Sequence, residues 1–388
     1  MRKRILTTHV GSLPRPERVV TQLFAQDSGL NYVESEFDAT MAAEVANIVA
    51  RQALAKVDVV SDGEMGKISY ATYIRHRLTG FELGEMPRAV PKDLDDFPDF
   101  KERLAKLGAT PKYQRPICTG PIAVKDLSGL HKDIANLKAA CAEAAAPGQP
   151  PLRAFMNSAS PGVIAVFQPN KYYASSELYL QALADAMATE YEAIVAAGLD
   201  LQIDAPDLAM GRHIKFRDVD DAEFLRNAHL QVEALNHALR NVPAERTRMH
   251  VCWGNYEGPH HHDIGLEKIL DVVLKAKPGT VLFEGANPRH AHEWEVWAKA
   301  GREGRIPDHK ILAPGVLDSV NNFIEHPRLV AQRLLTYANI VGRDRVMAAT
   351  DCGFGTFAGF GAIHPPICFA KLASMAEGAA IASEELWK

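Results

Sequence analysis

Short apolar runs alternate with longer amphipathic stretches along most of the chain. The short runs are rich in β-branched and apolar residues and usually end in a polar cluster, as buried strands do. The longer stretches carry apolar residues at helical spacing, as at 33–56, 176–197, 221–240, 266–275 and 327–340. The strand candidates are, in order, 6–10, 57–61, 153–156, 201–203, 248–251, 281–283, 311–316 and 346–349.

This alternation predicts parallel strands joined by crossover helices. Eight such units favour an α/β fold, a single (β/α)8 TIM-type barrel of typically about 250 residues, over an open Rossmann-type sheet. Most of the surplus length falls at 71–150, between the second and third strands, where we expect an excursion. Within it we predict a Pro- and Asp-rich loop at 87–100, an extended segment at 115–124 and a helix at 133–146. We expect residues 1–388 to form one catalytic barrel.

Composition narrows the class of protein. Hydrophobic residues make up 47% and charged residues 23%, as in ordinary globular proteins, and the net charge is −5. A mildly acidic chain is a poor partner for nucleic acid or an anionic membrane. We find no apolar run of the ~18 residues that would span a bilayer, and the basic start lacks a signal-like apolar stretch. Five cysteines form no disulfide framework, so we expect a cytoplasmic protein.

Chemically capable residues follow nearly every strand candidate. The active site of such a barrel lies at the carboxyl ends of its strands. Any one of these residues can be a cap or a turn residue, but their convergence on one face indicates an active site. They are His9, Ser12, Asp62, Glu64, Asn157, Ser158, Asp204, His250, Cys252, Glu284, Asp318, Asp351 and Cys352.

The segment MHVCWGN is the most specific of these signals. His250 and Cys252 are two residues apart on a predicted strand, so their side chains point to the same face. Imidazole and thiolate are standard zinc ligands. Cys352, in TDCGFGTF, can complete the set, and Glu284 ends the strand between them. The alternative is that these cysteines are buried as small apolar residues.

Two other motifs compete for the chemistry. The segment PHHHD at 259–263 is flanked by glycines, and three consecutive histidines cannot all face one ion, so we interpret it as a solvated loop or a lid beside the site. The segment GFGTFAG at 353–359 is similar to a dinucleotide-binding loop. It has one residue too many between its last glycines, and no βαβ unit follows it.

Seven segments occur in a familiar order: TTHVGSLPRP, SDGEMGK, QIDAP, HVC, FEGAN, GVLD and TDCGFGTF. Together they resemble the catalytic, C-terminal barrel of cobalamin-independent methionine synthase and its short single-barrel relatives. The resemblance runs from Thr7 to the final helical pattern. It implies a TIM-type barrel that holds zinc through His250, Cys252, Glu284 and Cys352.

The resemblance also implies a reaction and its small-molecule partners, a thiol and an alkyl donor. Zinc would convert the thiol, such as homocysteine, to a thiolate that attacks the donor. Ser12, Glu64 and Asp204 match positions that bind the amino acid part of homocysteine. Two carboxylates suit an ammonium group, and a Gly-Ser backbone turn suits a carboxylate. Nothing in the sequence predicts the oligomeric state.

The chain departs from the synthases where folate would react. Ala205 stands where they usually carry Glu, and their proton-donating His is missing after Asp318, where 319–322 reads SVNN. The sequence leaves His9 or Asp318 to supply the proton for the leaving group. We therefore expect slow or absent turnover of methyltetrahydrofolate.

Four functions fit these residues to different degrees. The first is a zinc-dependent methyltransferase that acts on a thiol. The alternative is an enzyme with the same zinc site that opens an epoxide with a thiol of the coenzyme M type, as some short relatives do, or that catalyses another carbon–sulfur lyase reaction. A purely structural zinc fits poorly because its ligands usually come from short loops, and a zinc hydrolase fits poorly because such sites usually favour His.

Overall fold

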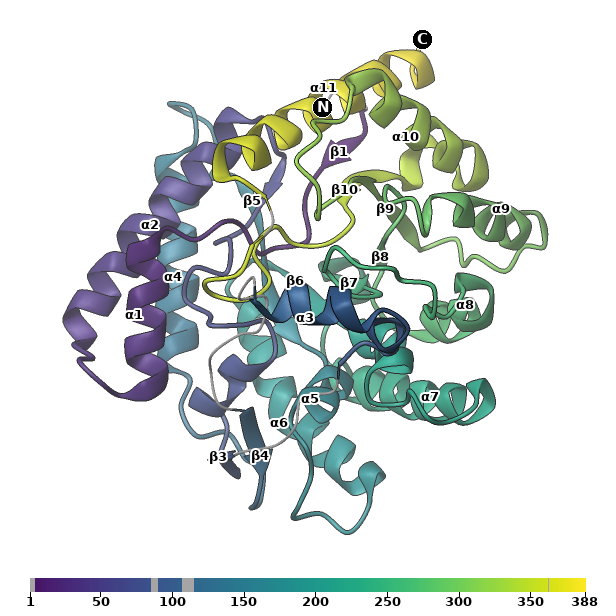
Figure 1. Cartoon of the computed structure of the whole chain (residues 1–388). Helices are drawn as coiled ribbons and strands as arrows, with labels where there is room; N and C mark the ends of the chain where they lie inside the picture. Colours follow the sequence, from purple (N-terminus) through teal and green to yellow (C-terminus); the bar gives the residue numbers. More distant parts are fainter. Residues whose placement is uncertain (1–3, 85–89, 107–114, 362) are drawn as a thin grey trace.

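The computed structural model describes residues 4–84, 90–106, 115–361 and 363–388. In this part of the chain, eight parallel strands form one sheet that curls almost into a closed barrel (Figure 1). Their order around the sheet is β1-β10-β9-β8-β7-β6-β5-β2. The strands are β1 (Leu6–Thr7), β2 (Val59–Val60), β5 (Arg153–Ala159), β6 (Asp200–Asp204), β7 (Thr247–Val251), β8 (Thr280–Phe283), β9 (Ile311–Leu317) and β10 (Met347–Thr350).

The ends of the sheet, β1 and β2, meet through hydrogen bonds. The Asp58 N–H donates to the Thr7 carbonyl at 3.2 Å, and the Thr8 hydroxyl donates to the Val59 carbonyl at 3.0 Å. The predicted (β/α)8 architecture is therefore confirmed, and each predicted strand is present. The first two strands are shorter than the sequence predicts because the chain leaves regular pairing as it turns toward the barrel end.

Helices surround the barrel (Figure 1). The amphipathic pattern of α8 illustrates why: Ile269, Leu270 and Val273 are buried while Glu267 and Lys268 are exposed. The five predicted helices are present, with ends that shift by a few residues. The helices of this ring are α1 (Glu17–Ser28), α2 (Glu34–Leu54), α4 (Ser128–Glu143), α5 (Pro161–Phe167), α6 (Ser176–Ala196), α7 (Asp221–Ala238), α8 (Leu266–Lys275), α9 (Trp294–Arg302), α10 (Pro327–Val341) and α11 (Pro365–Leu386).

The core has two parts, which strand β8 separates. Val281 and Phe283 pack in the large apolar cluster that the helices share. Leu282, which lies between them, joins a small cluster with Val10, Ala313 and Ala349. Successive side chains of a strand point to opposite faces. The small cluster therefore fills the barrel interior, and the reactive side chains lie above it, at the strand ends.

The helix predicted at 133–146 belongs to the barrel rather than to the excursion. It begins earlier, as α4 (Ser128–Glu143), and buries Leu130, Ile134 and Leu137 along one stripe. It packs against α2 and leads into β5. It therefore holds the place of the crossover helix between β2 and β5, and the excursion is shorter than the predicted 71–150.

The excursion contains a hairpin and a helix. The extended segment predicted at 115–124 forms β4 (Arg115–Cys118), which pairs antiparallel with β3 (Phe81–Gly84). The Pro- and Asp-rich segment predicted as a loop contains a 3-10 helix (Lys92–Asp95) and the start of α3 (Pro98–Lys106), while its residues 87–89 lie outside the described residues. The loop prediction was wrong there because the buried carboxylate of Asp93 anchors the segment, accepting from the His260 N–H at 2.9 Å.

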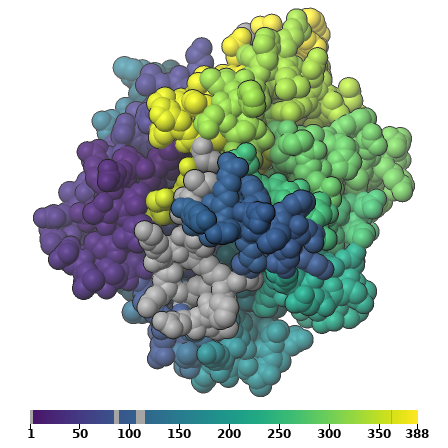
Figure 2. Space-filling view, in the orientation of Figure 1, coloured from purple at the N-terminus to yellow at the C-terminus, as the bar shows by residue number. Residues whose placement is uncertain are grey.

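Helix α3 lies across the carboxyl ends of the strands (Figure 1) and is on the surface that faces the viewer in Figure 2. Arg217, in the loop after β6, fixes this position, because it donates to the Val90 carbonyl at 2.9 Å and pairs with Asp95. The excursion therefore covers part of the barrel mouth. Among the residues that the structure describes, no helix combines the length and apolar character needed to cross a membrane.

Candidate active site

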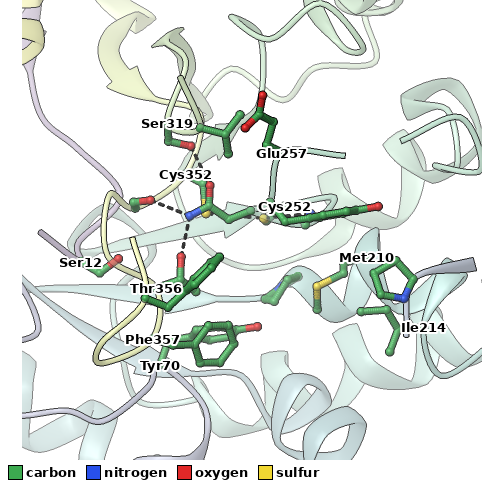
Figure 3. Close-up of a pocket in the computed structure, with 18 of the residues that line it drawn as sticks. Ser12, Tyr70, Met210, Ile214, Cys252, Glu257, Ser319, Cys352, Thr356 and Phe357 are labelled. Atoms are coloured by element: carbon green, nitrogen blue, oxygen red, sulfur yellow. Dashed lines mark hydrogen bonds between the residues drawn. The ribbon is translucent and has the colours of Figure 1, made fainter. Parts of the chain in front are cut away.

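A cavity of about 510 Å³ opens at the carboxyl ends of the strands, beneath α3. One end is polar and carries both predicted thiols (Figure 3). The remaining wall is largely apolar and includes Tyr70, Phe167, Met210, Ile214, Phe357 and Phe360. The cavity therefore joins a cluster of ligand side chains to a surface suited to apolar groups.

Three predicted metal ligands meet at the polar end. His250 and Cys252 come from the end of β7 and Cys352 follows β10, and their ligand atoms all lie within 4.8 Å of one another. The two Sγ atoms are 3.6 Å apart, close to the about 3.8 Å that two thiolates would have on a tetrahedral zinc. Both cysteines are buried and free of disulfides. The arrangement fits a soft metal ion.

His250 supports this fit because it lacks the partners that a buried histidine normally has. Neither ring nitrogen makes a hydrogen bond within the described residues. Burial and the positive charge of Arg248 lower the pKa of His250 to about 3, although the Leu282 backbone acts in the opposite direction. A buried imidazole that stays neutral and unpartnered is suited to metal ligation.

Cys252 and Glu284 are buried acidic groups whose pKa values are both raised. A hydrogen bond with Cys352, followed by burial, raises the pKa of the Cys252 thiol well above its ordinary value. Burial also raises the pKa of Glu284, and the charge of Cys252 adds to this effect. A cation would reverse both effects. Glu284 lies beside the cluster of three ligands, where it accepts from the Trp253 N–H and from Asn287, both at 2.7 Å.

The predicted carboxylate pair lies in the same cavity. Glu64 and Asp204 both line it and are buried. Burial, followed by the charge of Asp204, raises the pKa of Glu64 to about 8, and burial raises the pKa of Asp204 to about 6. Glu64 has a positive φ of 57°, and its Oε2 makes no hydrogen bond within the described ranges. Arg15 Nη2 lies 3.8 Å from this oxygen, so the carboxylate is ion-paired. A residue held at positive φ is typical of functional sites.

The turn after β1 brings Ser12 to the cavity. Gly11 precedes it with a φ of 143°, and a Cβ there would lie 2.4 Å from the Asn157 amide. Asn157 donates to the Val10 carbonyl and to Asp204, both at 2.9 Å. The turn and the carboxylate are thereby fixed relative to each other.

The two predicted proton donors are not brought to the cavity. His9 is buried, with Nε2 on Gln52 at 2.7 Å and Nδ1 accepting from the Gly11 N–H at 3.2 Å. Burial lowers its pKa to about 3. Asp318 accepts from the Val320 N–H at 2.8 Å and from Asn321 at 2.5 Å, so it shapes its own loop. Neither residue is among the described residues that line the cavity.

The histidine-rich segment divides its side chains between two carboxylates. His261 and His262 contact Asp96 at the surface, at 2.8 and 2.7 Å. His260 instead contacts the buried Asp263 at 2.9 Å. The prediction that the three cannot face one ion agrees with this arrangement, and the segment lies beside the cavity.

Sequence reasoning missed several polar residues of the cavity, among them one histidine and one asparagine. His213 and Asn255 both line it. Asn255 accepts from the Ser319 hydroxyl at 2.9 Å and donates to Thr356 at 2.6 Å, so it joins three strand-end loops (Figure 3). Both residues lie in loops, beyond the strand ends on which the prediction relied. A search along the loops after β6 and β7 would have found them.

The fold and the buried cluster define a TIM-type barrel with a candidate metal centre at its active-site end. No protein-family model matches the chain. Proteins named methionine synthase align with nearly all of it. The one from Saccharolobus solfataricus is 25% identical over 384 residues, 98% of this chain and 95% of the relative. The one from Sulfurisphaera tokodaii is 23% identical over 382 residues, 98% and 93% of the two chains.

Solved structures agree on the fold. A B12-independent methionine synthase from Shewanella sp. W3-18-1, in complex with selenomethionine, superposes with a TM-score of 0.72 at 18% identity and covers 99% of both chains. A putative vitamin-B12 independent methionine synthase from Listeria monocytogenes gives 0.66 at 16% identity, over 98% of this chain and 99% of that one. The chain is thus similar over nearly its whole length to proteins named methionine synthase, and it shares its fold with B12-independent methionine synthases.

Proposed function

We propose that this protein is a zinc-dependent thiol alkyltransferase of the methionine synthase type, which transfers a methyl group to a thiol such as homocysteine. The observation that carries the proposal is the buried cluster of His250, Cys252 and Cys352 at the end of the cavity. The methionine synthases that align with nearly the whole chain support the same reaction. All five cysteines are described and free, which suits the reducing cytoplasm.

In this proposal His250, Cys252 and Cys352 hold the zinc, and Glu284 stands beside them. Bound zinc would lower the pKa of a coordinated thiol, so that a thiolate is available near neutral pH. The Trp253 N–H and Asn287 fix the Glu284 carboxylate, as groups around metal ligands commonly do.

The amino acid end of the thiol would lie against the carboxylate pair. Glu64 and Asp204 share a buried region in which an ammonium group would relieve their mutual repulsion. The Ser12 side chain and the backbone of its turn can receive the substrate carboxylate. Homocysteine carries both groups, whereas a thiol such as coenzyme M carries no amino group.

The apolar wall of the cavity indicates which kind of alkyl donor would fit there. Tyr70, Phe357 and Phe360 supply aromatic surface, and the loop at 319–322, which has no titrating side chain, contributes Ser319 and Val320. This lining favours a second candidate, the opening of a small epoxide by a thiol of the coenzyme M type. Both reactions use the same thiolate and differ in the electrophile.

A thiol and donor screen tests the proposal. Zinc-loaded protein is incubated with homocysteine, coenzyme M or glutathione and with a methyl or epoxide donor, and S-alkyl products are detected by mass. We expect an S-alkylated thiol to form faster than in buffer or with Cys252→Ser protein. Rates equal to those of the variant for every pair would refute the proposal.

A further inference from the structure

His213 lines the cavity from the loop that follows β6. Its side chain is only 2% exposed, and its Nδ1 lies 2.7 Å from Oδ1 of Asp263. Its other nitrogen, Nε2, is buried and makes no hydrogen bond within the described part of the chain. The carboxylate therefore fixes the ring, and one nitrogen is left for a group in the cavity.

Asp263 is built into the protein as a charged anchor. Its side chain is fully buried, and it also contacts His260 at 2.9 Å and His290 at 3.0 Å. Although burial raises its pKa, the hydrogen bonds from the three histidines lower it well below its ordinary value. The carboxylate is therefore ionised, and it can accept a hydrogen bond from an imidazole N–H that touches it.

His213 is also tied to the end of the cavity that carries the thiols. The Met210 N–H, in the same short helical turn, donates to the Cys252 carbonyl at 3.0 Å. A Cβ built on Gly254 would lie 3.7 Å from Nε2 of His213, and the Gly254 N–H donates to the Cys252 sulfur at 3.3 Å. The free nitrogen thus lies beside the backbone that holds a metal-ligand sulfur.

We propose that Nε2 of His213 donates the proton that the leaving atom of the alkyl donor takes up. This inference rests on the proposed thiol alkyl transfer. The sulfur–carbon bond forms as the bond from carbon to the leaving nitrogen or oxygen breaks, and that atom keeps the electron pair. The proton passes from Nε2 to it, which leaves His213 neutral with its Nδ1–H on Asp263. Solvent, or the proton lost by the next thiol, restores the charged ring.

The proton donors that the sequence predicts, His9 and Asp318, do not line the cavity. His9 is held by Gln52 away from the cavity, and His250 is assigned to the metal. The residues at 319–322 include no group that titrates near neutral pH. In this proposal His213 takes the place of the proton-donating His that is missing after Asp318.

The test compares leaving groups in the zinc-loaded protein with homocysteine as the thiol. The donors are methyl iodide, whose iodide leaves without a proton, and 1,2-epoxypropane and methyltetrahydrofolate, whose oxygen and nitrogen need one. In His213→Gln we expect the best proton-requiring donor to slow by about 10²- to 10⁴-fold. Methyl iodide should slow by less than about tenfold, since general acid catalysis acts only where a proton is transferred.

Two controls separate catalysis from folding. His309→Gln removes an exposed histidine and should match the wild type with each donor. Zinc content and homocysteine affinity of His213→Gln should also match the wild type. If the variant binds less zinc, the rates are compared per bound zinc.

Three other outcomes would overturn the role of His213, and the last of them would also refute the proposed function. Equal slowing with iodide and epoxide, or no slowing with either, would overturn the role of His213 and leave the proposed function standing. Wild-type activity with methyl iodide alone would overturn it as well, because no proton would then be delivered. A wild type that alkylates homocysteine with none of the three donors would refute the proposed function, and the role of His213 with it.

Discussion

Two buried clusters that contain histidine lie side by side at the mouth of this barrel, and they differ in what surrounds the imidazoles. The first is the ligand cluster of His250 and two cysteines. The second is Asp263 with His213, His260 and His290. His250 has no hydrogen-bond partner for either nitrogen within the described residues, and its pKa falls to about 3. His290 contacts two carboxylates, Asp263 and Glu293, and although burial opposes the shift, their hydrogen bonds raise its pKa to about 10. The same residue type, equally buried, is neutral in one cluster and charged in the other.

The difference shows that the pKa of a buried histidine depends on the groups to which it is hydrogen-bonded. Beside two thiols, an unpaired imidazole is ready to give its lone pair to a metal. Beside an ionised carboxylate, an imidazole holds a proton. His213 contacts Asp263 of the second cluster but lines the cavity of the first, which is the position from which we propose that it donates a proton to the leaving atom.

The largest effect is expected from removing the two thiols. Cys252→Ser together with Cys352→Ser should lower zinc from about one per chain to a trace and reduce alkyl transfer to the buffer background, because hydroxyl groups are poor zinc ligands. Elemental analysis of dialysed protein measures the metal. Cys368→Ser, which alters a buried cysteine in α11, should keep both. Full zinc content in the double variant would show that these cysteines are not the ligands.

Loss of the Asp263 carboxylate, which three histidines share, should lower the stability of the fold. Asp263→Asn leaves three histidines without their shared carboxylate, and breaking a buried charge pair costs about 3–5 kcal/mol. Urea unfolding followed by circular dichroism measures the loss. An unchanged unfolding midpoint would mean that the cluster contributes little to folding.

The charge of His290 predicts how stability depends on pH. Its folded pKa of about 10 lies above the unfolded value of about 6.5. Its contribution is therefore complete below about pH 6.5 and is lost as the pH rises through about 10. The unfolding free energy of the wild type should fall over this window more steeply than that of His290→Gln. Parallel curves would contradict a protonated His290.

Binding of the homocysteine amino group should depend on Glu64 and Asp204 and not on either cluster. Glu64→Gln or Asp204→Asn removes a charged hydrogen bond worth about 1.5–3 kcal/mol, so homocysteine should bind roughly 10- to 150-fold more weakly. 2-Mercaptoethanol, which has no amino group, should bind almost as before, and the zinc content should not change. Calorimetric titration measures both thiols. Equal weakening would assign the carboxylates to metal geometry or to folding.

The smallest effect is expected at Asp96, a carboxylate that also contacts two histidines but lies at the surface. Asp96 contacts His261 and His262, but all three are exposed to solvent. Exposed ion pairs contribute little to stability, so Asp96→Asn should leave the midpoint of urea unfolding almost unchanged. A loss as large as that of Asp263→Asn would mean that burial does not distinguish the two carboxylates.

The sequence was sufficient for the barrel because short apolar runs and helical stripes report local structure directly. It was also sufficient to bring His250, Cys252 and Cys352 together, since each ends a strand. It failed for His9, because Gln52 of α2 holds that ring inside the protein. It missed His213, because the pairing with Asp263 joins residues 50 positions apart in two loops. Such pairings depend on tertiary packing, which periodicity does not encode.

X-ray absorption at the zinc edge tests the central role of the metal most directly. Zinc-loaded protein is measured with and without homocysteine, and the sulfur atoms bound to the metal are counted. Cys252 and Cys352 should supply two sulfurs at about 2.3 Å, and homocysteine should add a third at a similar distance. An unchanged sulfur count at saturating homocysteine would contradict activation of the thiol by the metal.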